Sequence, residues 1–246
     1  MTVCVIEHEK DAPPGLVARP GMEVRIVRPY AGDEIPTPGE LDGFTGLVVL
    51  GGEMGANDDD SHAWLAPTKT LIAAAVRREV PTLLICLGHQ LGAVALGGTV
   101  TRSPLGPMWG VVPVGRTEAG EDDDLLRHLP ADAAAVHWNG DLVVDPPPGA
   151  VVLARDPRGG IQAVRYGHRA WGVQCHPEVG AEIVTRWGGS VDADRDPAAA
   201  ARRDVALAQV GARETELRAT WIPVLDAFAA MTTGGVVMSR VTGEAP

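Results

Sequence analysis

Short apolar runs, separated by glycine, proline and charged residues, mark the first half of the chain. Thr2–Ile6, Leu47–Leu50 and Val80–Ile85 are almost wholly apolar. Runs of this length between turn signals are typical of strands that are buried on both faces. Glu23–Arg28 instead alternates charged and apolar residues, as a half-exposed strand does. The pattern therefore predicts four strands in this half.

A helix is predicted between two of these strands. Apolar residues in Trp64–Glu79 recur at helical spacing, and the basic pair Arg77-Arg78 lies near its end. Since strand, helix and strand follow one another here, they predict a right-handed crossover between parallel strands. Lys10–Ala18 is either a short helix or a loop. Ala31–Asp42 is rich in proline, glycine and acid, which predicts a surface loop.

The second half of the chain changes character. Its apolar runs are shorter and are separated by turn sequences such as PPPG and DPRGG. This pattern favours antiparallel hairpins added to a parallel sheet. The fold class is therefore predicted to be α/β, with a mostly parallel sheet flanked by helices. The strands expected in this half are Val111–Val114, Ala134–His137, Val151–Ala154, Ile161–Arg165 and Trp171–Cys175.

The C-terminal part of the chain is predicted to be mostly helical. Glu178–Trp187 is predicted to be a short helix, followed by a polar linker at Gly188–Asp196. Pro197–Gln209 and Arg213–Met231 are predicted to be two amphipathic helices that pack on the core or form a dimer face. We therefore expect one domain over residues 1–187, a helical extension over 188–231 and a mobile tail over 232–246.

Composition and charge narrow the range of partners. The 246 residues carry a formal net charge of −11, which disfavours nucleic acid and anionic membranes as partners. Three cysteines without framework spacing fit a reducing compartment. The N-terminus lacks the pattern of a signal peptide, and no apolar run reaches transmembrane length. A cytoplasmic location is the resulting expectation.

Cys86 is the first candidate for chemistry. It ends the apolar run Val80–Ile85 and precedes a predicted helix rich in small residues. A thiol at this turn lies near the positive end of the helix dipole, which favours the nucleophilic thiolate. The alternative is that Cys86 is a small buried hydrophobe at a strand end, the commonest fate of a free cysteine. This stretch alone supports both interpretations.

A second segment favours the catalytic interpretation. Another apolar strand ends at His176, and Glu178 follows two residues later. A cysteine with a distant histidine and carboxylate is a candidate set of nucleophile, base and orienting group. His89 is a weaker candidate base, because side chains of nearby helical residues point apart. His137 is as readily explained as an ordinary packed histidine.

Four segments, in order along the chain, resemble the class I glutamine amidotransferases. The segments LLICLGHQ at 83–90 and GVQCHPE at 172–178 resemble the two signature segments of that family. VVLGGEMGAN at 48–57 resembles its oxyanion-hole loop, and HWNGD at 137–141 resembles a segment beside the glutamine pocket of GMP synthase-like members. The resemblance covers roughly residues 1–187 and implies a flavodoxin-like sandwich with a catalytic set of Cys86, His176 and Glu178.

The resemblance also implies roles for residues that have plainer explanations. Gly51-Gly52 could be a simple turn, but the resemblance implies an oxyanion hole made by the backbone amides of Gly52 and Leu87. Gln90, one helical turn after the nucleophile, could be a surface residue, but the resemblance implies a contact with the glutamyl group. Substrate-binding residues are then expected at Gly51, Gln90, Asn139 and Asp141.

Two positions depart from the family pattern. Leu84 stands where the family usually has a glycine that relieves crowding before the nucleophile, so we expect a less sharp turn at Cys86. Cys175 stands where an aromatic residue usually precedes the histidine. Neither departure removes a catalytic group.

The function implied is that of a stand-alone glutaminase. Glutamine or another γ-glutamyl compound is the expected substrate, and an ATP-dependent synthetase is the expected partner for the ammonia. No metal or cofactor is predicted, because acidic runs such as those at 58–60 and 121–124 are typical of solvated loops or helix starts. Two alternatives stay open: a γ-glutamyl peptidase that cleaves γ-glutamyl conjugates, and a regulatory module that keeps the fold without turnover.

Overall fold

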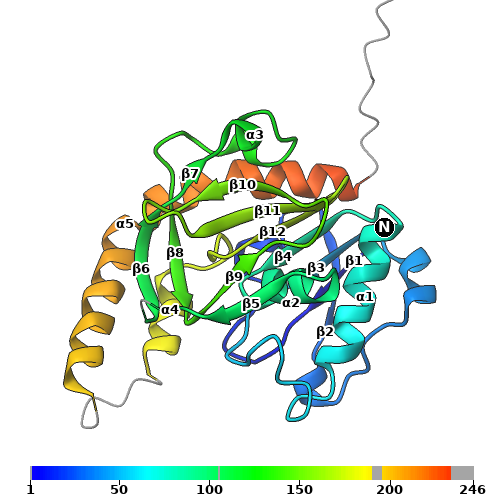
Figure 1. Ribbon diagram of the computed structural model, residues 1–246, viewed down its shortest axis with the longest axis horizontal. Helices are drawn as coiled ribbons and strands as arrows, with labels where there is room; N and C mark the ends of the chain where they lie inside the picture. Colours follow the sequence, from blue (N-terminus) through cyan, green and yellow to red (C-terminus); the bar gives the residue numbers. More distant parts are fainter. Residues whose placement is uncertain (1, 105, 190–195, 234–246) are drawn as a thin grey trace, which may run out of the picture.

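An eight-stranded sheet forms the centre of the computed structural model, which describes residues 2–104, 106–189 and 196–233 (Figure 1). Five neighbouring strands are parallel, and the last three run antiparallel. This confirms the predicted mostly parallel sheet. In spatial order the strands are β2 (Glu23–Val27), β1 (Thr2–Ile6), β3 (Gly46–Val49), β4 (Thr82–Ile85), β12 (Ala170–Val173), β11 (Ile161–Gly167), β10 (Val151–Arg155) and β7 (Gly115–Arg116).

Two small antiparallel sheets extend the fold beyond this centre. β5 (Thr99–Arg102) pairs with β9 (Asp141–Asp145), and β6 (Met108–Pro113) pairs with β8 (Ala134–Asn139). The second sheet is tied to the central one, because His176 forms an isolated bridge with Val136 of β8. The predicted antiparallel additions are therefore present, although they are separate sheets rather than hairpins only.

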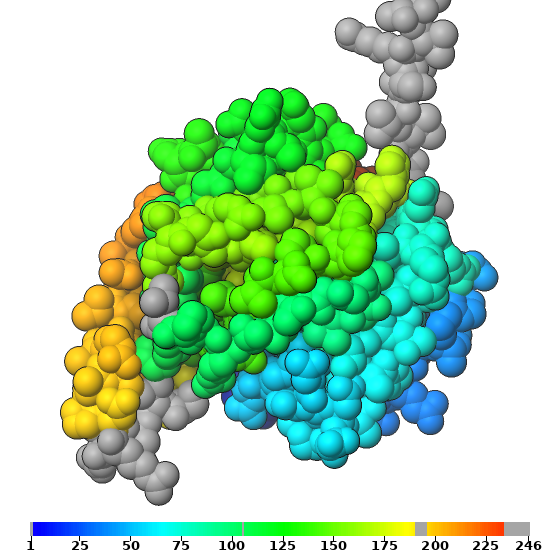
Figure 2. Space-filling model, viewed as in Figure 1, coloured from blue at the N-terminus to red at the C-terminus, as the bar shows by residue number. Residues whose placement is uncertain are grey.

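Helices cover both faces of the central sheet, and the strands alternate between them. Val3 and Val5 of β1 pack in one core, whereas Cys4 and Ile6 pack in the other. The first core is closed by α5 (Pro197–Thr232), and the second by α1 (Leu65–Arg77) and α2 (Leu87–Ala95). Figure 2 shows the α1 side in cyan and the first part of α5 in yellow and orange at opposite edges of the molecule.

The C-terminal part differs from the prediction of two helices. Pro197–Thr232 is one α-helix, which begins with the Asp196 side chain accepting a hydrogen bond from Ala199 N. Gly211 does not end it, because Val210 and Leu217 on either side are both buried in one core with Val184 of α4 (Ala181–Gly188). In Figure 1 the first part of α5 runs beside β6 and its later part lies along the central sheet. Residues 190–195 of the predicted linker and 234–246 of the predicted tail lie outside the described residues.

The predicted loops contain short helical turns. Lys10–Ala18 holds one 3₁₀ turn, η1 (Gly15–Val17). The Ala31–Asp42 segment is not entirely loop, because η3 (Pro38–Gly43) begins at a capping box between Thr37 and Glu40. The remaining short elements are η2 (Pro29–Ala31), α3 (Glu118–Glu121) and η4 (Leu126–His128). Within the described ranges, no helix has both the length and the apolar character needed to cross a membrane.

The parallel strands bring distant segments to one edge of the sheet. β3, β4 and β12 are neighbours and run in the same direction. Their carboxyl ends lead into Gly51-Gly52, Cys86 and His176 respectively. Residues at the carboxyl ends of such strands form the usual binding crevice of an open α/β sheet. The fold therefore places three of the four motif segments at a single crevice.

Candidate active site

Cys86 lies at a strained turn between β4 and α2. Its φ of 49° and ψ of −104° are unusual for a residue with a side chain, and such backbone strain costs roughly 1–3 kcal/mol. The turn is held by a hydrogen bond of 2.8 Å from Cys86 N to Val173 O. A Cβ added at Gly88 would lie 2.2 Å from Val49 O, so only glycine lets α2 approach β3 this closely. These constraints fix the thiol at the start of a helix.

The expectation that Leu84 would make this turn less sharp is wrong. Leu84 is completely buried and its side chain lies over Gly92 of α2, where an added Cβ would be only 2.5 Å from Leu84 Cδ1. Gly92 thus provides the space that a leucine needs, and the backbone at Cys86 keeps its strained conformation. Cys175, the other departure from the family pattern, is buried in the core.

His176 and Glu178 form a buried pair beside the thiol. His176 Nδ1 lies 2.8 Å from Glu178 Oε1, and His176 N donates a 2.8 Å hydrogen bond to Val136 O. Because Nδ1 is bound by the carboxylate, Nε2 is the ring nitrogen left to exchange a proton, and the Cys86 side chain is close enough to influence the pKa of His176. Three of the predicted site residues are therefore in one connected chain.

The charge of His176 is set by its neighbours. Burial lowers the pKa of His176, but the negative charges of Glu178 and Cys86 and hydrogen bonds to both raise it overall to about 10. The protonated form of the ring is thus stabilised by its position beside Glu178 and Cys86. Such a pair can supply a sulfur nucleophile and an adjacent proton donor.

Gln174 is a site residue that the sequence analysis missed. Its side-chain Nε2 lies 3.7 Å from Cys86 Sγ, and its Oε1 accepts a hydrogen bond of 3.3 Å from Gln90 Nε2. The signal was available, because Gln174 lies within the motif GVQCHPE, only two residues before His176. The amide therefore donates toward the sulfur while its oxygen is held by Gln90.

The predicted glutamyl-binding residues belong to the same network. Gln90 Nε2 also lies 3.1 Å from Asp141 O, and Asn139 Nδ2 donates to the same oxygen at 3.2 Å. The structure therefore brings Gln90, Asn139 and Asp141 together and links them to Cys86 through Gln174. The Asp141 side chain points to another partner, Arg102 on β5, whose Nη1 lies 3.3 Å from Asp141 Oδ1.

The other candidate bases have structural partners elsewhere. His89 Nδ1 lies 2.8 Å from the Tyr166 hydroxyl, and burial lowers the pKa of His89 to about 3. His137 Nδ1 lies 3.4 Å from Asn139 Oδ1, and burial lowers the pKa of His137 to about 4. Neither ring has the carboxylate partner that His176 has in Glu178. Burial therefore keeps both rings neutral, which suits packed residues.

The predicted oxyanion loop lies against the thiol and the histidine. A Cβ added at Gly51 would be 2.9 Å from His176 Cε1 and 3.6 Å from Cys86 Cβ. At Gly52 it would be 2.7 Å from the Met54 sulfur, so the Met54 side chain packs closely against the loop. Leu87 is the first residue of α2, where backbone N–H groups have no partner within the helix. Such groups can bind a developing negative charge.

A cavity of about 290 Å³ opens beside Cys86. One wall, here called the motif wall, consists of Gly52, Glu53, Cys86 and His176. The rest of the lining, here called the aromatic wall, consists of Trp138, Trp187, Arg186 and the segment Glu9–Ala12. All of these residues line the cavity. The predicted binding residues Gly51, Gln90, Asn139 and Asp141 are not among the lining residues.

Two tryptophans give the aromatic wall its character. The Trp187 ring centroid lies 4.6 Å from that of His176 and 6.3 Å from that of Trp138. Trp187 Nε1 donates a 2.7 Å hydrogen bond to Asp11 O, which ties α4 to the segment after β1. That segment is also tied to the oxyanion loop, because Glu9 Oε2 accepts a 3.1 Å hydrogen bond from Glu53 N.

The acidic runs serve the fold. Asp123 is buried and accepts hydrogen bonds from Trp171 Nε1 at 3.0 Å and from the backbone of Leu125 and Leu126. Asp59 pairs with Lys69 at 2.6 Å. Among the residues that the structure describes, no three histidine, cysteine or acidic side chains are grouped in a way that could hold a metal ion.

Comparison with known proteins places this geometry in a family context. The family model described as glutamine amidotransferase class-I matches residues 16–183. The chain is 33% identical over 171 residues to the glutamine amidotransferase-like protein YfeJ of Salmonella typhimurium, a match that covers 67% of this chain and 68% of YfeJ. It is 32% identical over 162 residues to a glutamine-hydrolysing GMP synthase subunit of Saccharolobus solfataricus, covering 65% and 78% of the two chains.

A peptidase and a solved structure are also similar to this chain. Gamma-glutamyl peptidase 5 of Arabidopsis thaliana is 28% identical over 153 residues, which cover 61% of this chain and 60% of the peptidase. The crystal structure of a glutamine amidotransferase from Thermotoga maritima superposes with a TM-score of 0.78 at 26% identity, covering 93% of this chain and 97% of the other.

Proposed function

The chain belongs to the class I glutamine amidotransferase family, and on this premise we propose that it hydrolyses the side-chain amide of glutamine through a γ-glutamyl thioester on Cys86. The observation that carries the proposal is the connected set of Cys86, His176 and Glu178 at the strained turn. A strained, buried cysteine paired with a protonated histidine is costly for the fold unless it serves chemistry.

In the first half of the proposed reaction the Cys86 thiolate attacks the side-chain carbonyl carbon. The carbonyl oxygen becomes an oxyanion, which the backbone amides of Gly52 and Leu87 would stabilise. One such donor is typically worth about 3–4 kcal/mol. The carbon–nitrogen bond then breaks, and the His176 ring gives its proton to the departing nitrogen. Ammonia leaves, and the γ-glutamyl group stays on the sulfur as a thioester.

In the second half of the proposed reaction, water attacks the carbonyl carbon of the thioester and hydrolyses it. His176, now neutral, takes a proton from the attacking water, and the sulfur leaves again as a thiolate. Glu178 would hold the ring through Nδ1 and stabilise its positive charge. Glutamate is the final product. Gln90, Asn139, Asp141 and the Gly51 backbone would contact the glutamyl part, once Gln90 exchanges a bond within its network for one to the substrate.

The extent of the domain and the fate of the ammonia form part of the proposal. We assign the glutaminase to residues 1–187 and treat 188–231 as an extension, because the family match ends at residue 183. The similarity to a glutamine-hydrolysing part of GMP synthase supports an ATP-dependent synthetase as the acceptor of ammonia. The retained set of Cys86, His176 and Glu178 disfavours a regulatory module without turnover.

A second candidate function is cleavage of γ-glutamyl conjugates. The similarity to a gamma-glutamyl peptidase supports it, and so does the aromatic wall, which ammonia as a leaving group does not require. Both functions use the same thioester and differ in the amine that departs.

The test is release of glutamate from glutamine and from a panel of γ-glutamyl compounds by the purified protein. Wild type should release glutamate from at least one of them, and Cys86→Ala should release none. Activity retained by Cys86→Ala would contradict the proposal. A Cys4→Ala control, altered at a buried cysteine in the opposite core, should match wild type.

A further inference from the structure

We propose that Trp187 and Trp138 form a subsite for an apolar or aromatic group on the leaving amine. The preferred substrates are then γ-glutamyl amides of such amines rather than glutamine itself. This inference rests on the proposed thioester chemistry and, between the two candidate functions, favours the second, cleavage of γ-glutamyl conjugates. It is carried by the position of the two rings relative to His176.

The position of the leaving amine follows from the position of the proton donor. A general acid must lie within about 2.6–3.2 Å of the nitrogen to which it gives its proton. The leaving nitrogen therefore sits next to the His176 ring. Trp187 is packed against that ring, with 4.6 Å between the two centroids, and both residues line the cavity. A substituent on the leaving nitrogen that enters the cavity meets the aromatic wall.

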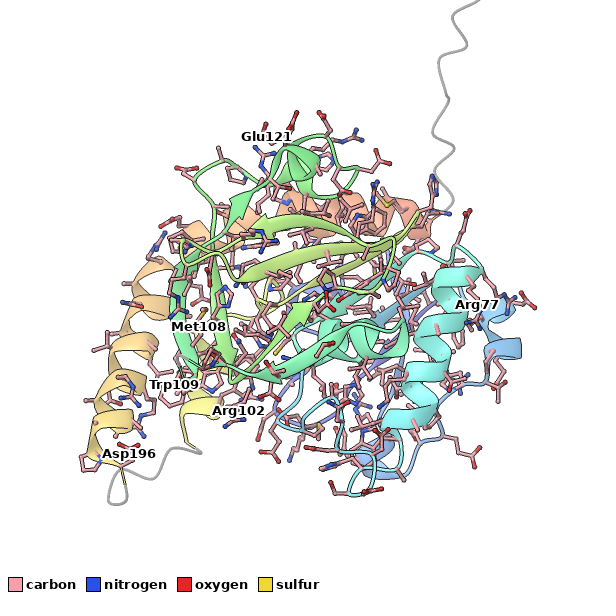
Figure 3. All side chains as sticks on the ribbon, viewed as in Figure 1. Arg77, Arg102, Met108, Trp109, Glu121 and Asp196 are labelled. Atoms are coloured by element: carbon pink, nitrogen blue, oxygen red, sulfur yellow. The ribbon has the colours of Figure 1, made fainter. Side chains whose placement is uncertain are left out.

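The two tryptophans are held in place before any substrate binds. Trp187 is fixed by its hydrogen bond to Asp11 O. Trp138 is stacked on Trp109 of β6, with 5.4 Å between ring centroids and 21° between ring planes. Trp109 in turn packs beside the first part of α5, where Figure 3 labels it, and the Arg202 guanidinium carbon lies 5.9 Å from its ring centroid. A preorganised wall binds at lower entropic cost than one that must be ordered.

Ammonia as the leaving group would not need an aromatic wall. Ammonia is small and polar, whereas large aromatic side chains at a binding surface contribute through apolar contact and stacking. Both tryptophans remain half-buried although they line the cavity, so each keeps apolar surface that a ligand could cover. Covering that apolar surface with a ligand removes it from water, which favours binding.

Charged side chains also line this opening, and they bear on whether the leaving amine carries a carboxylate. Arg186 Nη2 is paired with Glu182 at 2.5 Å, and Glu9 is bound to Glu53 N. Lys10 and Asp11 also line the opening. An amino acid as leaving group would bring a carboxylate near Lys10, and a simple amine would not. In either case the apolar group of the leaving amine contacts the two tryptophans.

The test compares γ-glutamyl benzylamide with γ-glutamyl methylamide. The two substrates form the same thioester, so they share its hydrolysis, and a difference in kcat/KM reports binding and departure of the amine. Wild type should prefer the benzylamide by at least about tenfold, since even one methylene in an apolar pocket is worth tenfold or more. Trp187→Ala should bring the ratio near one, and Trp187→Phe should keep most of it.

Two controls make the result specific to the subsite. Phe44→Leu, which changes a partly buried aromatic ring that packs beside Arg25 and does not line the cavity, should keep the wild-type ratio. Equilibrium binding to Cys86→Ala should show the same preference without turnover, and Cys86→Ala with Trp187→Ala should lose it. A wild-type ratio near one, or a preference unchanged by Trp187→Ala, would overturn the inference.

The controls also separate this inference from the proposed function. If Cys86→Ala still hydrolyses the amides, the thioester proposal fails, whereas the binding preference and its loss with Trp187 would still test the subsite. A further arm compares γ-glutamyl phenylalanine with γ-glutamyl benzylamide. A preference for the former that Lys10→Ala removes would identify amino acids as the source of the amine.

Discussion

The two walls of the cavity are built in different ways. The motif wall comes from the carboxyl ends of three adjacent parallel strands, so its residues are placed by the regular sheet. The aromatic wall comes from the segment after β1, the end of β8 and the last turn of α4, which meet only through tertiary packing. In the motif wall Cys86 has a strained backbone and both Cys86 and His176 are buried, whereas Trp138 and Trp187 in the aromatic wall are only half-buried.

This difference suggests a division of roles. The motif wall holds the groups needed to make and break a thioester, which is common to every γ-glutamyl substrate. The aromatic wall touches only the part of the substrate that varies. Changes in the first wall should therefore affect all substrates equally, and changes in the second should alter the ratio between substrates.

The largest expected effect is loss of the nucleophile or the base. Cys86→Ala and His176→Ala should each lower kcat by at least about a thousandfold, because the members of such a set act as a unit. The loss should be the same for glutamine and for larger amides when initial rates are compared. A loss confined to one class of substrate would contradict the division between the walls.

Glu178→Gln should have the next largest effect and should also move the pH profile. Since the pKa of His176 is raised to about 10, the ring is protonated below that value, and kcat/KM should fall as pH rises through about 10. Removing the Glu178 charge lowers the pKa of His176, so the fall should occur at lower pH. A Glu178→Gln profile identical with wild type would show that Glu178 does not set the charge of His176.

The same pKa shift predicts a stability change with pH. The ordinary pKa of histidine is about 6.5, so the folded state holds a proton on His176 more tightly than the unfolded chain does. The stabilisation is therefore fully present below about pH 6.5 and is lost as pH rises through about 10. Urea unfolding of wild type and His176→Ala across this range should show a smaller pH-dependent loss in the variant.

Gly15 packs against the backbone of Glu178, and a change there should have a smaller effect. Its φ is 49°, and an added Cβ would lie 2.1 Å from the Glu178 carbonyl oxygen. Gly15→Ala should lower the free energy of unfolding by roughly 3 kcal/mol, since a left-handed alanine costs about 1–2 kcal/mol and the clash adds to it. Gly21→Ala is the matched control, because Gly21 is also left-handed but faces open space. It should lower the free energy of unfolding only by about 1–2 kcal/mol, the cost of the left-handed conformation. Equal losses in urea unfolding would show that the contact with Glu178 carries no cost.

Gln174→Leu should have the smallest effect of the set. It removes the donor near the Cys86 sulfur, and a hydrogen bond to a charged group is worth about 1.5–3 kcal/mol, so kcat/KM should fall about 10- to 100-fold. Gln162→Leu is the control, because this neighbouring buried glutamine of β11 bonds through its side chain to Asp156 and not to the Cys86 sulfur. If both variants kept wild-type kcat/KM, Gln174 would have no role at the sulfur.

The division between the walls also explains what the sequence could predict. Strands with long apolar runs and the residues at their ends were predictable, because strand direction and motif order bring Cys86 and His176 together. The family model confirms the resemblance seen in those motifs. The short strands β5, β7 and β9 were missed, since sequences such as TVTR and DLVVD bury few side chains and depend on their partners.

The other misses depend on packing between distant segments. Trp187 lies eleven residues beyond His176, and only the docking of α4 brings its ring against the imidazole. The tight turn beside Leu84 was misjudged because Gly92, on the next helix, supplies the missing space. The break expected near Gly211 is absent because tertiary contacts on both sides outweigh the roughly 1 kcal/mol that glycine costs a helix.

The central claim is that Cys86 carries the γ-glutamyl group during turnover. The most direct test is to quench the reaction with acid during steady-state hydrolysis of a γ-glutamyl amide and to map the modified peptide by mass spectrometry. The account predicts a γ-glutamyl thioester on Cys86, with Cys4 and Cys175 unmodified because Cys86 lines the cavity and the other two cysteines do not. A γ-glutamyl group found on Cys175 instead of Cys86 would contradict it.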